Sequence, residues 1–79
     1  MARVLLFGRL ADIAGWRERE MELGGRVSDL RAALIAEAPE LAALAGKEVR
    51  VAVDQALVGG DPSLAGAAEV AFLPPFSGG

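Results

Sequence analysis

The chain has 79 residues, a formal net charge of −3, and neither cysteine nor histidine. This length is enough for one small domain with a modest core, and without cysteine the chain can form no disulfide and no thiolate metal site. The missing histidine and cysteine also remove the common metal ligands and the side chain that titrates near neutral pH, while scattered basic residues in an acidic chain argue against nucleic acid as a partner.

The first predicted element is the short apolar run RVLLFG at residues 3–8, which is typical of a strand buried on both faces. RLADIAG at residues 9–15 predicts one helical turn or a loop that closes at Gly15. REREMEL at residues 17–23 alternates glutamates with Met21 and Leu23. That alternation indicates a half-exposed strand near the edge of a sheet, where charge discourages unwanted pairing.

One long helix is predicted from GGRVSDLRAALIAEAP. Ser28 is its expected N-cap, with Asp29 in the first turn and Pro39 as the stop. Residues 40–45 predict a further short turn that Gly46 ends. The expected apolar stripe of the helix consists of Leu30, Ala33, Leu34 and Ala38.

Three more strands are expected after the helix. EVRVAVD at residues 48–54 alternates valines with Glu48, Arg50 and Ala52, so it predicts a strand with one apolar face. QALVGGDP at residues 55–62 predicts a very short strand around Leu57 and then a turn. AEVAFLP at residues 68–74 is apolar on both faces, like the first strand.

The order strand, strand, helix, strand, short strand, strand predicts a two-layer α+β domain. The first and last strands should lie together in the middle of a mixed sheet of about five strands, with the one main helix covering one face. This is the ubiquitin-like β-grasp arrangement. We expect a single domain over residues 1–79 with a flexible C-terminal tail at residues 74–79.

Arg3 and Asp12 interrupt the apolar start, so no secretory signal is predicted. The sequence also has no apolar stretch approaching the ~20 residues of a membrane-spanning helix. The lack of cysteine fits a reducing cytosol. We therefore expect a cytoplasmic protein with no membrane partner and no nucleic-acid partner.

The ending FLPPFSGG is an unusual way to finish a small fold, because glycine loses the most conformational freedom on ordering. Pro74 and Pro75 lack N–H donors, so the strand cannot continue through them. Beyond Phe76, the residues 77–79 form a thread thin enough to enter a narrow tunnel in another protein. The alternative is a frayed end without a role.

A C-terminal carboxylate is a poor electrophile and would need activation, for which adenylation is suitable. Attack on the acyl-adenylate by sulfide or a persulfide would give a thiocarboxylate, whereas attack by a lysine would give an isopeptide bond. The absence of cysteine favours the thiocarboxylate, since sulfur carried by this chain has nowhere else to reside.

Four blocks of sequence carry a resemblance to a known family: VLLFGRLADIAG, VSDLRAAL, VAVDQALV and EVAFLPPFSGG. With them the chain resembles, over essentially its whole length, the small subunits of molybdopterin synthase, which are ubiquitin-like sulfur carriers. The Gly-Gly end is shared by all ubiquitin-like carriers, and the EVAFLPPFSGG block is the more specific match.

The resemblance implies that an ATP-dependent E1-like enzyme adenylates Gly79 and that a sulfur donor converts it to a thiocarboxylate. The sulfur would pass to cyclic pyranopterin monophosphate in the large subunit of molybdopterin synthase, which supplies the catalytic residues. The chain would thus be no enzyme on its own, and ATP would be used by the activating enzyme and not held here. Tail insertion would involve Pro75, Phe76, Ser77 and Gly78.

The resemblance also makes Phe7, Phe72 and Leu73 candidates for the apolar contact with a partner. Because Phe7 and Phe72 lie in strands expected to be buried, a core role is favoured over an interface role for both. Phe76 lies beyond the two prolines, so an interface role is favoured there.

Three other functions stay open. One is a sulfur carrier for thiamine thiazole synthesis, although such carriers are typically shorter and lack PPF before the glycines. Another is a ubiquitin-like modifier that is conjugated to lysines. The last is a β-grasp binding module in which the tail has no role.

Overall fold

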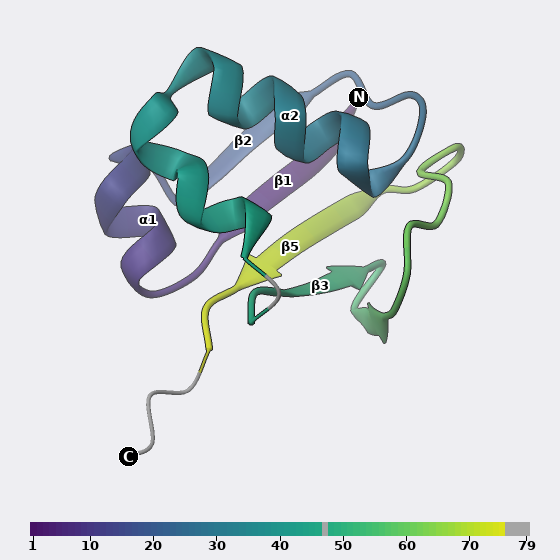
Figure 1. Cartoon of the computed structure of the whole chain (residues 1–79). Coiled ribbons are helices and arrows are strands. Elements are labelled where there is room, and N and C mark those ends of the chain that lie inside the picture. The colour runs from purple at the N-terminus through teal and green to yellow at the C-terminus, as the bar shows by residue number, and fades with distance from the viewer. Residues whose placement is uncertain (47, 76–79) are drawn as a thin grey trace.

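The computed structural model describes residues 1–46 and 48–75, which form one sheet with helices packed on one of its faces (Figure 1). The sheet has five strands in the order β2-β1-β5-β3-β4. The β-grasp prediction is therefore confirmed. In chain order the elements are β1 (Ala2–Leu6), α1 (Arg9–Ala14), β2 (Glu18–Met21), α2 (Val27–Glu37), the 3₁₀ helix η1 (Pro39–Ala45), β3 (Arg50–Val53), β4 (Ala56–Val58) and β5 (Glu69–Leu73).

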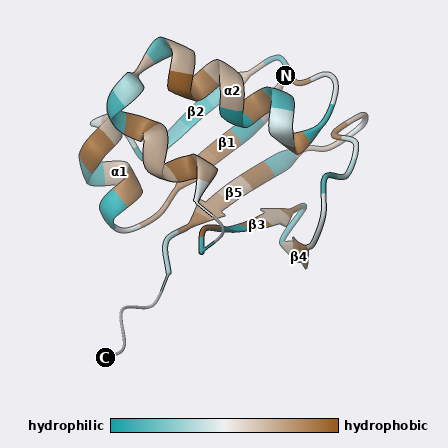
Figure 2. Cartoon of the chain, in the orientation of Figure 1, coloured by the Kyte–Doolittle hydropathy of each residue, from teal (hydrophilic) through white to brown (hydrophobic). Residues whose placement is uncertain are grey.

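The first and last strands are parallel neighbours in the middle of the sheet, as predicted, with Val4 opposite Val70 and Leu6 opposite Phe72. All other strand pairs are antiparallel. Strand β2 lies at one edge, where its glutamates are exposed and Met21 is half-buried. Figure 2 shows this contrast between the hydrophilic β2 and the hydrophobic centre of the sheet.

The core lies between the sheet and the helices. Phe72 at the centre of β5 is fully buried, and the strand residues that face the helices alternate with more exposed ones on β1 and β3. The largest fully buried side chains are Phe72, Leu34, Leu41, Leu44, Leu64, Val4, Val27 and Val70.

The buried stripe of α2 differs from the predicted one. Its buried residues are Val27, Leu30 and Leu34, which follow i, i+3, i+7 spacing, whereas Ala33 is exposed. The helix begins at Val27, one residue before the predicted N-cap, and this places the valine side chain in the core. Placing Ala33 in the stripe was therefore wrong.

The predicted N-cap of α2 was also wrong. The cap position belongs to Arg26, whose backbone is extended and whose N–H donates to the Asp29 carboxylate at 2.8 Å. Ser28 lies inside the first turn and is bonded to Asp61, a residue of the distant loop before β5.

Two shorter segments agree with the sequence in outline. The predicted turn at residues 9–15 is α1, which ends at Gly15 in the left-handed conformation with its N–H bonded to the Ala11 carbonyl at 2.8 Å. Strand β3 has the predicted single apolar face, since Val51 is buried and Arg50 is exposed. It starts at Arg50 and not at Glu48.

An ion pair between Arg19 and Glu37 joins β2 to the end of α2. Both terminal nitrogens of Arg19 donate to the Glu37 carboxylate, at 2.6 and 3.0 Å, and the guanidinium lies 5.0 Å from the centre of the Trp16 ring. These hydrogen bonds lower the pKa of Glu37 from its ordinary value. Trp16 is half-buried beside this pair.

Candidate functional site

The prediction that β1 is buried on both faces was wrong, and the reason locates a surface. All helices cover one face of the sheet (Figure 1), so the alternate residues of the central strands face away from them. On β1, Arg3 is exposed and Leu5 is half-buried, while Val4 and Leu6 are in the core. We call the uncovered side the open face.

Apolar side chains occupy the middle of the open face. The strand registers place Leu5 opposite Ala71, Ala71 opposite Ala52, and Ala52 opposite Leu57, so one row crosses from β1 to β4. Leu57 ends the row at the far edge and is 63 % exposed. Ala71 is buried, whereas Leu5 and Ala52 are half-buried, so the row leaves apolar surface in water on both sides of Ala71 and is a candidate docking surface.

A second row lies nearer the end of β5. Phe7 follows β1, and its N–H donates to the Phe72 carbonyl at 3.2 Å, which brings it beside the end of β5. Leu73 lies opposite Arg50 on the other side of that strand. Phe7 is 45 % exposed and Leu73 is half-buried. The open face therefore extends to the point where the chain leaves the sheet.

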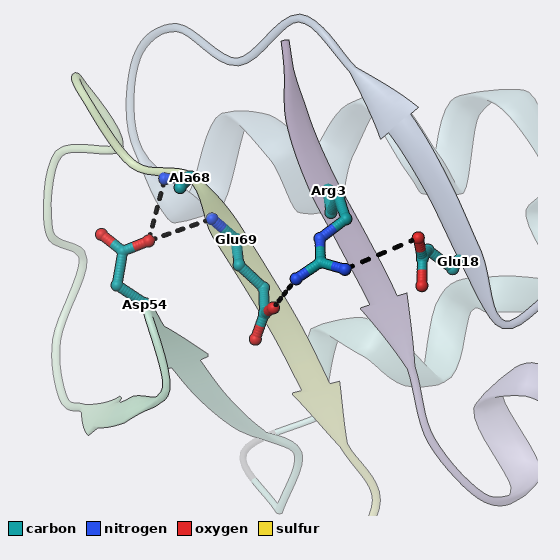
Figure 3. A network of polar contacts seen from close by, with 5 residues as sticks. All are labelled: Arg3, Glu18, Asp54, Ala68 and Glu69. Atoms are coloured by element: carbon teal, nitrogen blue, oxygen red, sulfur yellow. Dashed lines mark hydrogen bonds and ion pairs between the residues drawn. The ribbon is translucent and has the colours of Figure 1, made fainter.

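Charged residues border the opposite end of the open face (Figure 3). Arg3 on β1 donates to Glu69 on β5 at 2.8 Å and lies 3.9 Å from Glu18 on β2. The Asp54 carboxylate accepts hydrogen bonds from the N–H groups of Ala68 and Glu69, at 2.8 and 3.0 Å. Any partner on the apolar rows would meet this polar border on one side and the chain exit on the other.

The start of the tail rests against α1. Pro74 and Pro75 line a shallow groove with Leu10, Ile13 and Val49. Pro74 is half-buried and Pro75 is exposed. The prolines end β5 at Leu73, as expected from their missing N–H donors. The chain therefore leaves the sheet between the open face and α1.

The residues of the predicted site divide into four groups. Phe7 and Leu73 lie on the open face, and Pro75 lies in the groove beside α1. Phe72 is fully buried in the core, so the favoured core role is confirmed and its candidate contact with a partner was wrong. The remaining predicted tail residues, Phe76, Ser77, Gly78 and Gly79, lie outside the described residues.

For Phe7 the structure reverses the expectation of a core role. Its strand ends at Leu6, and the continuing alternation turns Phe7 to the open face. The sequence interpretation missed three residues of that face: Leu5, Ala52 and Leu57. Their signal was the alternation itself, which VLLF and ALV are too short to display clearly.

Among residues 1–46 and 48–75 no group of three or more acidic, histidine or cysteine side chains is placed to hold a metal ion. No helix in that part of the chain combines the length and apolar character that crossing a bilayer requires. What the described residues provide is an apolar candidate docking surface, and β5 ends beside it at Pro74.

Comparison with known proteins identifies the family. The ThiS family model matches residues 4–79. A crystal structure of SAMP1 from Haloferax volcanii is similar, with a TM-score of 0.78 and 26% identity, covering 99% of this chain and 98% of that one.

A crystal structure of the H. volcanii small archaeal modifier protein 1 has the same fold, with a TM-score of 0.66 and 22% identity over 96% of this chain and 100% of that one. The curated protein sequences contain no match. The family model covers nearly the whole sequence and includes both the open face and the tail, and the chain therefore belongs to the ThiS family of ubiquitin-like sulfur carriers.

Proposed function

We propose that this protein is the sulfur carrier of molybdenum cofactor synthesis and that it acts as the small subunit of molybdopterin synthase. One observation carries the carrier role: the family match runs through Gly79, six residues after the end of a central strand that two prolines terminate beside an apolar open face. The molybdopterin branch is favoured by the EVAFLPPFSGG block.

The proposed cycle uses the carboxylate of Gly79. In an E1-like enzyme that carboxylate attacks the α-phosphorus of ATP, and pyrophosphate leaves. Sulfide then attacks the acyl carbon, AMP leaves, and the chain carries a thiocarboxylate. The large subunit passes the sulfur to cyclic pyranopterin monophosphate, with the catalytic residues on the large subunit and none on this chain.

In this cycle the open face gives affinity for each partner in turn, and the tail delivers the reacting group. Leu5, Phe7, Leu57 and Leu73 would bury apolar surface against the partner, which is the main favourable term in association. Gly78 would give clearance in the partner's active site, while Ser77, Phe76 and Pro75 would steer the tail.

The test is mass spectrometry of the purified chain after incubation with an E1-like enzyme, ATP and a sulfide source. Replacement of one terminal oxygen by sulfur is expected in the native chain. A variant with one residue appended after Gly79 is the matched control and should keep its mass. The E1-like enzyme is first shown to modify the carrier with which it naturally acts. If the mass of the native chain then stays unchanged with the same enzyme, the carrier role is overturned.

The molybdopterin assignment needs a separate measurement. The thiocarboxylated chain is mixed with the large subunit and cyclic pyranopterin monophosphate, and formation of the dithiolene product is followed. Product is expected from the thiocarboxylate and not from the untreated carboxylate. Sulfur transfer to a thiazole-forming enzyme, with none to the pterin, would support the thiamine alternative instead.

A second function is favoured by the similarity to SAMP1 and to the H. volcanii small archaeal modifier protein 1. As a modifier, the activated Gly79 would be attacked by a lysine amine of a target protein. Adducts that survive reductant and contain the terminal Gly-Gly on a target lysine would support this function.

A further inference from the structure

Gly8 and Pro74 meet where the two central strands end. Because β1 and β5 are parallel, both finish at the same edge of the sheet. There the chain after β1 turns into α1, and the chain after β5 begins the tail. A Cβ atom placed on Gly8 would lie 3.0 Å from Cγ and 3.8 Å from Cδ of Pro74.

Gly8 is held firmly on the side of α1. Its carbonyl accepts hydrogen bonds from the N–H groups of Ala11 at 3.1 Å and Asp12 at 3.3 Å. Its φ of 55° and ψ of −130° belong to a region that side chains with a Cβ rarely adopt. The residue before it, Phe7, is bonded to β5 through the Phe72 carbonyl at 3.2 Å. Gly8 is therefore a fixed reference point for the tail.

Pro74 is confined from the other directions. It follows the last residue of β5, so its backbone starts from a central strand, and its φ is fixed by the ring. Its ring also lines the groove with Leu10 and Ile13 of α1. On the side of Gly8 the ring meets a residue without a side chain, where an added Cβ would lie 3.0 Å from Cγ of Pro74.

Resting on the proposed carrier function, we propose that Gly8 is a positioning residue for the C-terminal tail. Its missing Cβ lets the Pro74 ring rest on the start of α1, and this contact sets the direction in which the following residues leave the sheet. A contact of 3.0 Å is tighter than ordinary van der Waals contact, so a methyl group at Gly8 would displace the ring. The tail would then start from a displaced position relative to the open face.

The chain offers a matched control at the other end of α1. Gly15 also has a positive φ, 83°, and also terminates the helix, but a Cβ there would meet nothing within 4 Å. Gly8→Ala and Gly15→Ala both place an alanine at positive φ, but the left-handed helical conformation of Gly15 (ψ 12°) tolerates alanine better than the conformation of Gly8 (ψ −130°). Of the two substitutions, only Gly8→Ala places a methyl group against the Pro74 ring.

The experiment measures the kinetics of adenylation by an E1-like enzyme with the full chain as substrate. Gly8→Ala is expected to raise KM for the chain several-fold with little change in kcat, because fewer encounters present a correctly directed tail. Gly15→Ala should leave both constants near those of the native chain and should lose less thermal stability than Gly8→Ala, whose backbone conformation tolerates a Cβ less well. Equal KM values for Gly8→Ala and the native chain would overturn the proposal.

Rescue separates positioning from a general structural defect. In a Pro74→Ala background the atoms that the new methyl group meets are gone, so Gly8→Ala should raise KM less than it does beside the native proline. The same increase in both backgrounds would show that Gly8 does not act through Pro74.

A measurement without any enzyme keeps this proposal distinct from the proposed function. In NMR spectra, nuclear Overhauser contacts between the Gly8 α-protons and the Pro74 ring are expected in the native chain. The Phe72 and Leu73 amide shifts should move in Gly8→Ala and not in Gly15→Ala. If the native chain showed these contacts but were not adenylated, the carrier function would fail and the contact would stand. Absence of the contacts would overturn the positioning role.

Discussion

The Asp61 carboxylate holds the first turn of α2 through Ser28. Oδ1 accepts a hydrogen bond from the Ser28 backbone N–H at 2.8 Å, and Oδ2 accepts one from the Ser28 hydroxyl at 2.7 Å. The Arg26 guanidinium also donates to the Asp61 carbonyl at 2.9 Å. A loop residue 33 positions away thus satisfies a free N–H at the helix start and places a negative charge at its positive end.

Replacing Asp61 should weaken the start of α2 and with it the core contacts of Val27 and Leu30. We expect Asp61→Ala to lower the thermal midpoint by several degrees, a typical result of losing a helix cap. Ser28→Ala is the control: it removes the hydroxyl but keeps the backbone N–H, and should cost less. Circular dichroism melts measure both, and equal midpoints for Asp61→Ala and the native chain would contradict the capping role.

The same pair predicts an acid dependence of stability. Hydrogen bonds from Ser28, first from its hydroxyl and then from its backbone, hold the pKa of Asp61 below its ordinary value. A lowered folded pKa means that the interaction stabilises the fold above the unfolded pKa and is lost as pH falls through the folded one. The free energy of unfolding should therefore fall on acidification below about pH 4.

The control for this dependence is Asp61→Asn, which keeps an acceptor but cannot titrate. The lowered pKa of Glu37 is common to both proteins, so the difference between their pH profiles isolates Asp61. Urea unfolding at a series of pH values should give a steeper acid loss for the native chain than for the variant. Parallel profiles would refute the assignment.

The Asp61 cap also shows what the sequence could and could not predict. Local patterns were enough for the strand order, because the apolar runs of β1 and β5 require central positions and the charged alternation of β2 requires an edge. A cap supplied from a distant loop has no local pattern, and a serine near a helix start was the nearest local signal.

The candidate site divides in the same way. Pro74 and Pro75 mark the end of the fold in the sequence, and they do so in the structure. Phe7 and Phe72 have similar sequence surroundings, but Phe72 is in the core and Phe7, just after β1, is exposed. Which face a short strand buries depends on its register with its neighbours, and that is a tertiary property.

Phe72 and Phe7 should therefore respond oppositely to truncation. Phe72→Ala removes a fully buried ring and should cost about 3–5 kcal/mol of unfolding free energy. Phe7→Ala removes a ring that is 45 % exposed and should cost far less, but should weaken binding to the E1-like enzyme or the large subunit. Chemical denaturation and titration calorimetry measure the two effects. A Phe7 variant with unchanged affinity would remove that residue from the interface.

A charge on the open face should interfere with docking and leave the fold intact. Leu57→Asp puts a carboxylate at the 63 % exposed end of the apolar row, where desolvation by a partner would be costly. Ala56→Asp is the matched control, since its neighbouring position on β4 is exposed but has the opposite orientation. We expect a several-fold loss of partner affinity for Leu57→Asp alone. Equal losses would mean that general charge, and not the open face, is responsible.

The turn between β3 and β4 offers a stabilising change. Asp54 and Gln55 form its two central residues with φ of 49° and 71°, the pattern of a hairpin turn that favours Asp-Gly. Asp54 is fixed by its bonds to Ala68 and Glu69, but no hydrogen bond of the Gln55 side chain is found among the described residues.

Gln55→Gly removes the Cβ from the left-handed conformation, a relief of about 1–2 kcal/mol. The greater freedom of glycine in the unfolded chain takes back roughly 0.5–1 kcal/mol. A net gain of up to about 1.5 kcal/mol should appear as a higher thermal midpoint. Ala56→Gly, at the next position, has the same entropic cost but no positive φ to relieve, so it should lower the thermal midpoint. A Gln55→Gly variant that melts at or below the native temperature would show that the turn is not strained.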